Sequence, residues 1–124
     1  MMRGWLCAEL NAPAPNRESQ MVRVSVLYPN EPGKRFDHAY FADKHLPMVM
    51  DRLKSFGMLR YEVDIGVGGS AGAPPPFVAA AHLYFNAAGD FRQGTRAHGS
   101  ELRGDIPNYT DISPQVQISE IVAG

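Results

Sequence analysis

The sequence predicts an α+β domain in which four strands and two helices follow the order β-α-β-β-α-β. Four short segments alternate apolar with polar residues or are almost wholly apolar, as strands do. Two longer segments with helical spacing follow the first and the third of these strands. A chain of 124 residues, 44% hydrophobic and 20% charged, is long enough to bury one core without disulfides or metal.

Residues 1–20 differ from the rest, and we expect them to form an irregular N-terminal extension to a folded domain at 21–124. The stretch 11–17 holds two prolines and has no periodicity, which is typical of extended or mobile chain. Met21 directly precedes the first strand and is a candidate start of the protein. The alternative is a leader that packs Trp5 and Leu6 against a neighbouring subunit.

The first strand and helix are predicted at 22–28 and 36–56. Valines alternate with other residues through the strand until Pro29 ends it. Asp37 is a suitable N-cap for the helix, and Gly57 is a suitable stop. His45 falls on the apolar side of the helix, and Pro47 should kink or divide the helix near Lys44.

The second half of the chain repeats this organisation more loosely. We expect a strand at 59–65, a loop at 66–76, a strand at 77–85, a helix at 90–103, a loop at 105–114 and a last strand at 115–122. The strand at 77–85 is apolar on both faces apart from His82, so it should be central in the sheet. Gly94 and Gly99 weaken the helix prediction by about 1 kcal/mol each relative to alanine.

This element order predicts a ferredoxin-like fold, a four-stranded antiparallel sheet with both helices on one face. The strands at 22–28 and 77–85 have apolar residues on both sides, and two helices cover only one of them. We therefore expect the other face to need a partner, most simply in a homodimer whose sheets pack face to face.

Composition excludes several classes of function. A net charge of −1 without a basic run gives no basis for binding nucleic acid or an anionic membrane, and no segment has the length of a membrane span. The lone Cys7 excludes an internal disulfide, and the histidines lack the spacing of a local metal site. We expect a cytoplasmic protein without metal or tightly held cofactor.

The candidate catalytic residues are His45, Tyr28 and His82. An imidazole that titrates near neutral pH, with phenols nearby, suits acid–base chemistry on an uncharged organic molecule. His45 is also explained as a structural histidine with its hydrogen bonds satisfied in the core. His82 is harder to explain that way, because an apolar strand makes an unpartnered imidazole costly.

Five further residues are candidates for binding the substrate. Tyr40 begins the first helix and Tyr84 ends the third strand, so both should approach Tyr28 at one mouth of the sheet and helices. The loop after the second helix adds a carboxylate, an amide and a phenol at Asp105, Asn108 and Tyr109.

Several segments resemble the EthD family. The most specific are Lys44-His45-Leu46-Pro47 and Asp105-Ile106-Pro107-Asn108-Tyr109, and the resemblance covers roughly residues 21–122. It implies a dimeric α/β-barrel, in agreement with the uncovered sheet face. It also suggests a link to an oxygenase system, because the family is named for an ether-degradation gene cluster that contains a cytochrome P450.

Three functions are compatible with this resemblance. The first is an enzyme or accessory protein of a degradation or biosynthetic pathway that acts on a small, largely apolar compound by cofactor-independent acid–base or oxidoreductase chemistry. In this hypothesis His45 is the acid or base, and Tyr28, His82 or Tyr84 orients the substrate. The second is a non-catalytic carrier for an oxygenase system, and the third is haem binding through one histidine.

Overall fold

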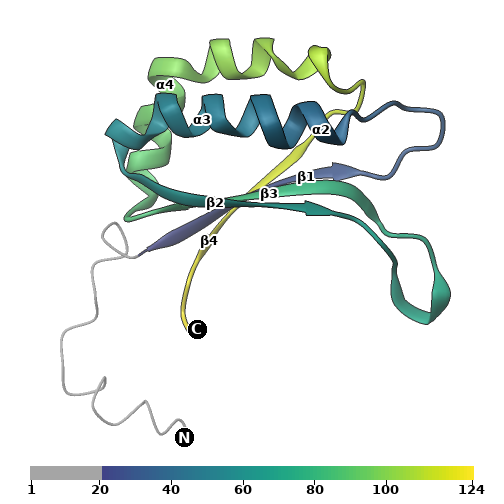
Figure 1. The fold of residues 1–124 in the computed structure, drawn as a ribbon. Coiled ribbons are helices and arrows are strands. Elements are labelled where there is room, and N and C mark those ends of the chain that lie inside the picture. Colours follow the sequence, from purple (N-terminus) through teal and green to yellow (C-terminus); the bar gives the residue numbers. More distant parts are fainter. Residues whose placement is uncertain (1–20) are drawn as a thin grey trace, which may run out of the picture.

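The chain forms a four-stranded antiparallel sheet with two helical segments on one face, as predicted (Figure 1). A computed structural model describes residues 21–124, and both expectations for residues 1–20 lie outside that range. The strands are β1 (Val22–Pro29), β2 (Met58–Ile65), β3 (Phe77–Phe85) and β4 (Gln115–Glu120). Their spatial order β2-β3-β1-β4 is the ferredoxin-like order, and β3 is central beside β1, as its apolar sequence indicates.

The first helical segment is interrupted before Pro47. It consists of α2 (His38–Tyr40), a π-helical turn η2 (Phe41–His45), α3 (Leu46–Leu53) and a 3-10 turn η3 (Lys54–Phe56). Pro47 has no N–H for the helical ladder, and the preceding N–H of Leu46 bonds to the carbonyl of Phe41, five residues back. The predicted break near Lys44 is therefore confirmed as a π-turn.

Both predicted ends of this segment are also confirmed. The Asp37 side chain accepts a hydrogen bond from the backbone N–H of Tyr40 at 3.0 Å. Gly57 follows η3 with φ of +100°, a left-handed conformation that glycine adopts without strain.

The second helical segment is longer and regular. α4 (Ala88–Gly104) is followed by the 3-10 turn η5 (Ile106–Asn108), and a further 3-10 turn, η4 (Ser70–Gly72), lies in the loop between β2 and β3. α4 packs on α3 at Gly94, where a Cβ atom would lie only 2.8 Å from Leu53. Among residues 21–124, no helix is both long enough and apolar enough to cross a bilayer.

The core lies between the helices and the face of the sheet that carries Val22, Val24 and Tyr28. Side chains alternate along each strand, so the intervening residues point to the opposite, open face. Figure 1 shows both helical segments above one face of the sheet and no described element across the other.

The expectation of an apolar open face is wrong. Strand register places these residues on it: Arg23, Ser25 and Leu27 of β1, Glu62 and Asp64 of β2, Ala80, His82 and Tyr84 of β3, and Gln117 and Ser119 of β4. Only Leu27 and Ala80 among these are apolar. The sequence pattern misleads because the small alanines of β3 count as apolar on both faces, while the flanking strands supply polar side chains.

Candidate active site

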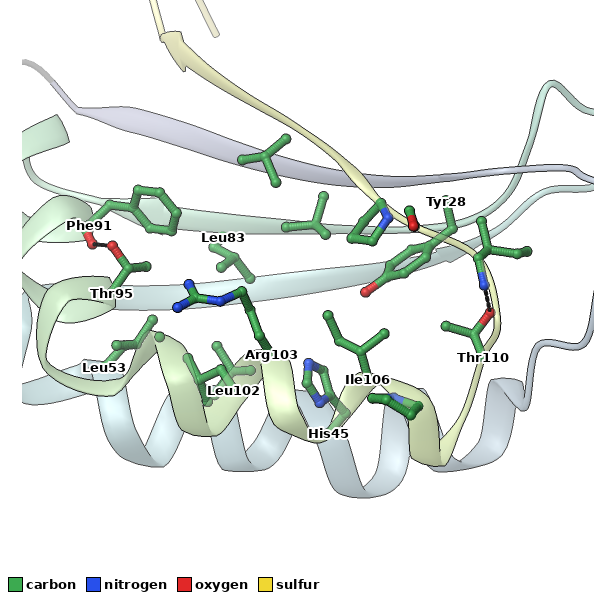
Figure 2. A pocket seen from close by; sticks show the side chains of 18 of the residues that line it. Tyr28, His45, Leu53, Leu83, Phe91, Thr95, Leu102, Arg103, Ile106 and Thr110 are labelled. Atoms are coloured by element: carbon green, nitrogen blue, oxygen red, sulfur yellow. Dashed lines mark hydrogen bonds between the residues drawn. The ribbon is translucent and has the colours of Figure 1, made fainter.

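A pocket of about 740 Å³ lies between the sheet, α3, α4 and the segment that follows α4 (Figure 2). Its wall is mostly apolar and comes from all of these elements: Val26, Val49, Leu53, Leu83, Phe91, Leu102, Ile106, Ile112, Pro114 and Val116. The polar side chains that interrupt this wall include those of Tyr28, His45, Thr95 and Arg103. Such a pocket suits an apolar organic molecule that is oriented by a few polar contacts.

His45 lies at the pocket with one ring nitrogen bound to a carboxylate. Its Nδ1 is 2.8 Å from Oδ2 of Asp105, and the side chain is buried. An ionised carboxylate only accepts hydrogen bonds, so Nδ1 carries the proton and donates it to Asp105. The other nitrogen, Nε2, has no hydrogen-bond partner within residues 21–124 and is left as the acceptor.

The π-turn contributes to this position. His45 is the last residue of η2, and the extra residue in that turn rotates it relative to the regular helix that follows. The ring stacks on Phe41 with a centroid distance of 6.0 Å and lies 4.8 Å from the Tyr109 ring. The contacts with Phe41 and Tyr109 and the hydrogen bond to Asp105 therefore hold the imidazole in this orientation.

The surroundings keep His45 neutral. Burial lowers its pKa, and the hydrogen bond and charge of Asp105 oppose this effect without overcoming it. A neutral imidazole with a free Nε2 is the form that accepts a proton.

Asp105 connects three polar side chains. Besides His45, it accepts hydrogen bonds at Oδ1 from the Tyr40 hydroxyl at 2.8 Å and from Nδ2 of Asn108 at 2.9 Å. Burial raises the pKa of Asp105, but these three donors outweigh it and the pKa is lowered. The hydrogen bond to Asp105 in turn raises the pKa of Tyr40. Asp105 is thus an ionised carboxylate that orients the histidine.

Tyr28 and Tyr109 form a buried phenol pair beside His45. Their hydroxyl oxygens are 2.6 Å apart, and burial raises the pKa of both groups. Tyr109 is fully buried and its hydroxyl has no other partner within the described residues. Since a buried donor needs an acceptor, Tyr109 donates to Tyr28, which leaves the Tyr28 proton for the pocket that Tyr28 lines.

The structure therefore brings six of the eight candidate residues together: His45, Tyr28, Tyr40, Asp105, Asn108 and Tyr109. It does not bring His82 and Tyr84 to the pocket. Both point to the open face of the sheet, where His82 bonds to Ser25 and Asp64 at 2.9 Å each, and Tyr84 bonds to Glu62. Although Tyr28 and Tyr84 both lie near strand ends, the side chain of Tyr28 in β1 points to the helix side of the sheet and that of Tyr84 in β3 points to the open face.

Five polar residues that line the pocket were not among the candidates: Thr110, Asp111, Ser113, Thr95 and Arg103. The last two line one wall. Both come from α4, where Phe91, Thr95, Gly99 and Arg103 follow each other at intervals of four and line the same wall. The spacing is visible in the sequence, but Gly99 conceals it because a glycine contributes nothing to an apolar or polar stripe.

The arrangement can accept a proton at His45 Nε2 and donate a hydrogen bond from Tyr28, within a mostly apolar enclosure. Tyr28 is 1% and His45 6% exposed, so a ligand meets them only at the inner end of the pocket. Within the described part of the chain, no group of three or more His, Cys, Asp or Glu side chains is placed to hold a metal ion.

Comparison with known proteins gave matches among solved structures. No family model matches the sequence, and no curated protein matches it. An EthD-like protein from Ralstonia eutropha is 48% identical, with 85% of this chain and 95% of that chain covered and a TM-score of 0.81.

Two more distant structures share the fold. An EthD family protein from Bacillus halodurans is 19% identical, with 82% of this chain and 99% of that chain covered and a TM-score of 0.64. A dimeric ferredoxin-like protein from an uncultured marine organism is 9% identical, with 84% and 96% covered and a TM-score of 0.52. At these identities the likeness supports the fold alone.

Proposed function

The chain belongs to the EthD family, and from this premise we propose that its pocket binds a small, largely apolar organic compound and converts it by acid–base chemistry at His45. The observation that carries the proposal is the state of His45, whose Nδ1 is held by Asp105 while Nε2 is unpaired at the pocket. A histidine with a purely structural role would have both nitrogens bonded in a filled core.

The proposed step is a proton transfer. Nε2 of His45 takes a proton from an acidic C–H or O–H bond of the substrate, and the electron pair of that bond stays on the substrate as an anion. Asp105 stabilises the imidazolium that forms, and the Tyr28 hydroxyl donates a hydrogen bond to the anion. Return of the proton to another atom of the substrate completes an isomerisation. In an elimination the electron pair of the anion instead expels a leaving group, which takes up the proton from His45, and an oxidation requires dioxygen as the electron acceptor.

The proposal includes a homodimer formed through the open faces of two sheets. A hollow where Leu27, Ala80 and His82 of that face meet the loop between β2 and β3 is a place where a second copy could make contact. A dimeric protein is also among the structures that share the fold. For the cellular setting, the family resemblance favours a cytoplasmic degradation or biosynthetic pathway that contains an oxygenase system.

Hydrogen–deuterium exchange tests the chemistry without knowledge of the product. Small aromatic and alicyclic carbonyl compounds are first screened for binding by ligand-observed NMR, and the binders are then incubated with protein in D₂O. We expect the wild type to catalyse exchange of an acidic C–H, and His45→Asn to bind the same compound with exchange reduced roughly 10²-fold or more. His98→Asn is the matched control, because His98 does not line the pocket.

The outcomes separate the rival functions. Compounds that bind without exchange in the wild type would contradict the catalytic role and favour the non-catalytic carrier. Exchange that survives in His45→Asn would remove His45 from the mechanism. A folded protein that binds none of the compounds would contradict both the enzyme and the carrier.

A further inference from the structure

Arg103 is a cation without a protein partner at the wall of the pocket. Within residues 21–124 its guanidinium makes no hydrogen bond and no ion pair, although it lines the cavity. Arg52, Arg35 and Arg60 each pair with a carboxylate, whereas Arg23, Arg92 and Arg96, which likewise make no ion pair among the described residues, do not line the pocket. The two carboxylates closest in sequence, Glu101 and Asp105, are already engaged, since Glu101 pairs with Arg52 at 3.0 Å and Asp105 binds His45.

Gly99 allows the Arg103 side chain to lie back along α4. A Cβ atom at position 99 would come within 2.7 Å of Nη1 of Arg103. Figure 2 shows the guanidinium extending from the end of α4 toward Thr95, on the side of the cavity where Phe91 and Leu83 lie. A cation in the last turn of a helix is favourable wherever it points, so the helix dipole does not explain why this side chain lies along the pocket.

From these observations we infer that the ligand carries an acidic group, a carboxylate or a comparable organic anion, which Arg103 binds while the apolar body fills the cavity. The inference rests on the proposed function and specifies the substrate class. The planar guanidinium can hold a carboxylate through two parallel hydrogen bonds. Asp111, which also lines the pocket, lies 3.7 Å from Arg35 and makes no ion pair with Arg103 among the described residues.

The anion also orients the ligand relative to His45. Arg103 extends along α4, whereas His45 and Tyr28 lie by the phenol pair and Asp105. A ligand held at one end by Arg103 therefore presents a different part of its body to Nε2 of His45. The acidic group of the ligand contributes to binding and is separate from the bond that reacts.

Two probes of the same shape test the inference, sodium 2-naphthoate and its neutral analogue 2-naphthamide. We expect isothermal titration calorimetry at low salt to give naphthoate at least about tenfold tighter binding than the amide, because a hydrogen bond between two charged groups is stronger than one to a neutral group. Added NaCl should reduce this preference because part of the Arg103 side chain is exposed.

Variants identify the group responsible. Arg103→Gln should lose the preference for naphthoate and bind the amide as before, while Arg96→Gln, an exposed arginine of the same helix outside the pocket, should behave as wild type. Gly99→Ala displaces the guanidinium without removing its charge, and should also weaken naphthoate binding.

Failure of the inference is distinguishable from failure of the proposed function. Equal affinities for the two probes in the wild type, or no effect of Arg103→Gln on naphthoate, would overturn the inference and leave an apolar binding pocket. If neither probe binds to the folded protein, the inference fails together with the proposed pocket.

Discussion

Asp105 binds Nδ1 of His45 and leaves Nε2 for the pocket, so its substitution should change the pKa and tautomer of the imidazole more than it changes the fold. Asp105→Asn removes the charge that opposes the effect of burial, and we expect the pKa of His45 to fall further below its usual value. The measurement is an NMR titration of the His45 ring, with the nitrogen shifts reporting the tautomer. Asn108→Ala, which removes one of the other donors to Asp105, should leave the dominant tautomer unchanged.

The lowered pKa of His45 also predicts how stability depends on pH. The unfolded chain binds the His45 proton near pH 6.5, whereas the folded protein binds it only at lower pH. The contribution of the neutral imidazole to stability is therefore complete above pH 6.5 and is lost as the pH falls toward the folded-state pKa. Urea unfolding at a series of pH values should show this decline, and His45→Gln should flatten it. An unchanged slope in that variant would assign the decline to other groups.

The phenol pair allows a double-mutant cycle. Tyr109→Phe leaves Tyr28 without its buried partner, and Tyr28→Phe leaves the Tyr109 hydroxyl without an acceptor. Each single substitution should lower the free energy of unfolding by about 1–2 kcal/mol, and the double substitution by less than the sum, because it removes both hydroxyls together. Denaturant unfolding measures all three. Additive losses would mean that the 2.6 Å hydrogen bond contributes nothing.

Among the elements, the sequence predicts features that depend on local signals and fails for those that depend on tertiary packing. Asp37, Pro47 and Gly57 are local signals, and each acts where the sequence places it. The sequence also predicts part of the surroundings of His45, because the candidates Asp105, Asn108 and Tyr109 lie close together in one loop. The sheet faces of His82 and Tyr84 depend on which side the helices cover, which is a tertiary property. Arg103 shares the four-residue spacing of Phe91 and Thr95, but the path of its side chain depends on the space above Gly99, which the spacing does not predict.

Two glycines of α4 should respond in opposite ways to alanine. Alanine favours a helix over glycine by about 1 kcal/mol, so Gly99→Ala should stabilise the protein, since only the flexible end of Arg103 must move. At Gly94 the new methyl would meet Leu53, which is buried in the core, and overpacking of this kind costs about 1–3 kcal/mol. Gly94→Ala should therefore unfold at lower denaturant than the wild type. Equal gains at both sites would show that the contact between α4 and α3 is loose.

For the whole molecule, the open face of the sheet is the surface through which we propose that two copies associate. It combines charged and polar side chains that are already paired, such as His82 with Asp64 and Tyr84 with Glu62, with the apolar Leu27 and Ala80. Such a face is stable in water as well as in an interface, so polarity alone does not select between monomer and dimer. We propose a second copy of the chain because it would exclude water from the half-buried Leu27; Ala80 beside it is already buried in the single chain.

Leu27→Glu tests this dimer. Leu27 is half-buried on the open face and lies between Ala80 of β3 and Gln115 of β4, so a carboxylate there would oppose its own copy across a twofold interface. We expect light scattering after size exclusion to give the dimer mass for the wild type and the monomer mass for the variant, with the circular dichroism of the fold retained. Val67→Glu adds the same charge at a position that is 93% exposed in the loop after β2, and it should remain dimeric. A wild type that is monomeric at micromolar concentration, or a Leu27→Glu variant that stays dimeric, would exclude this face as the interface.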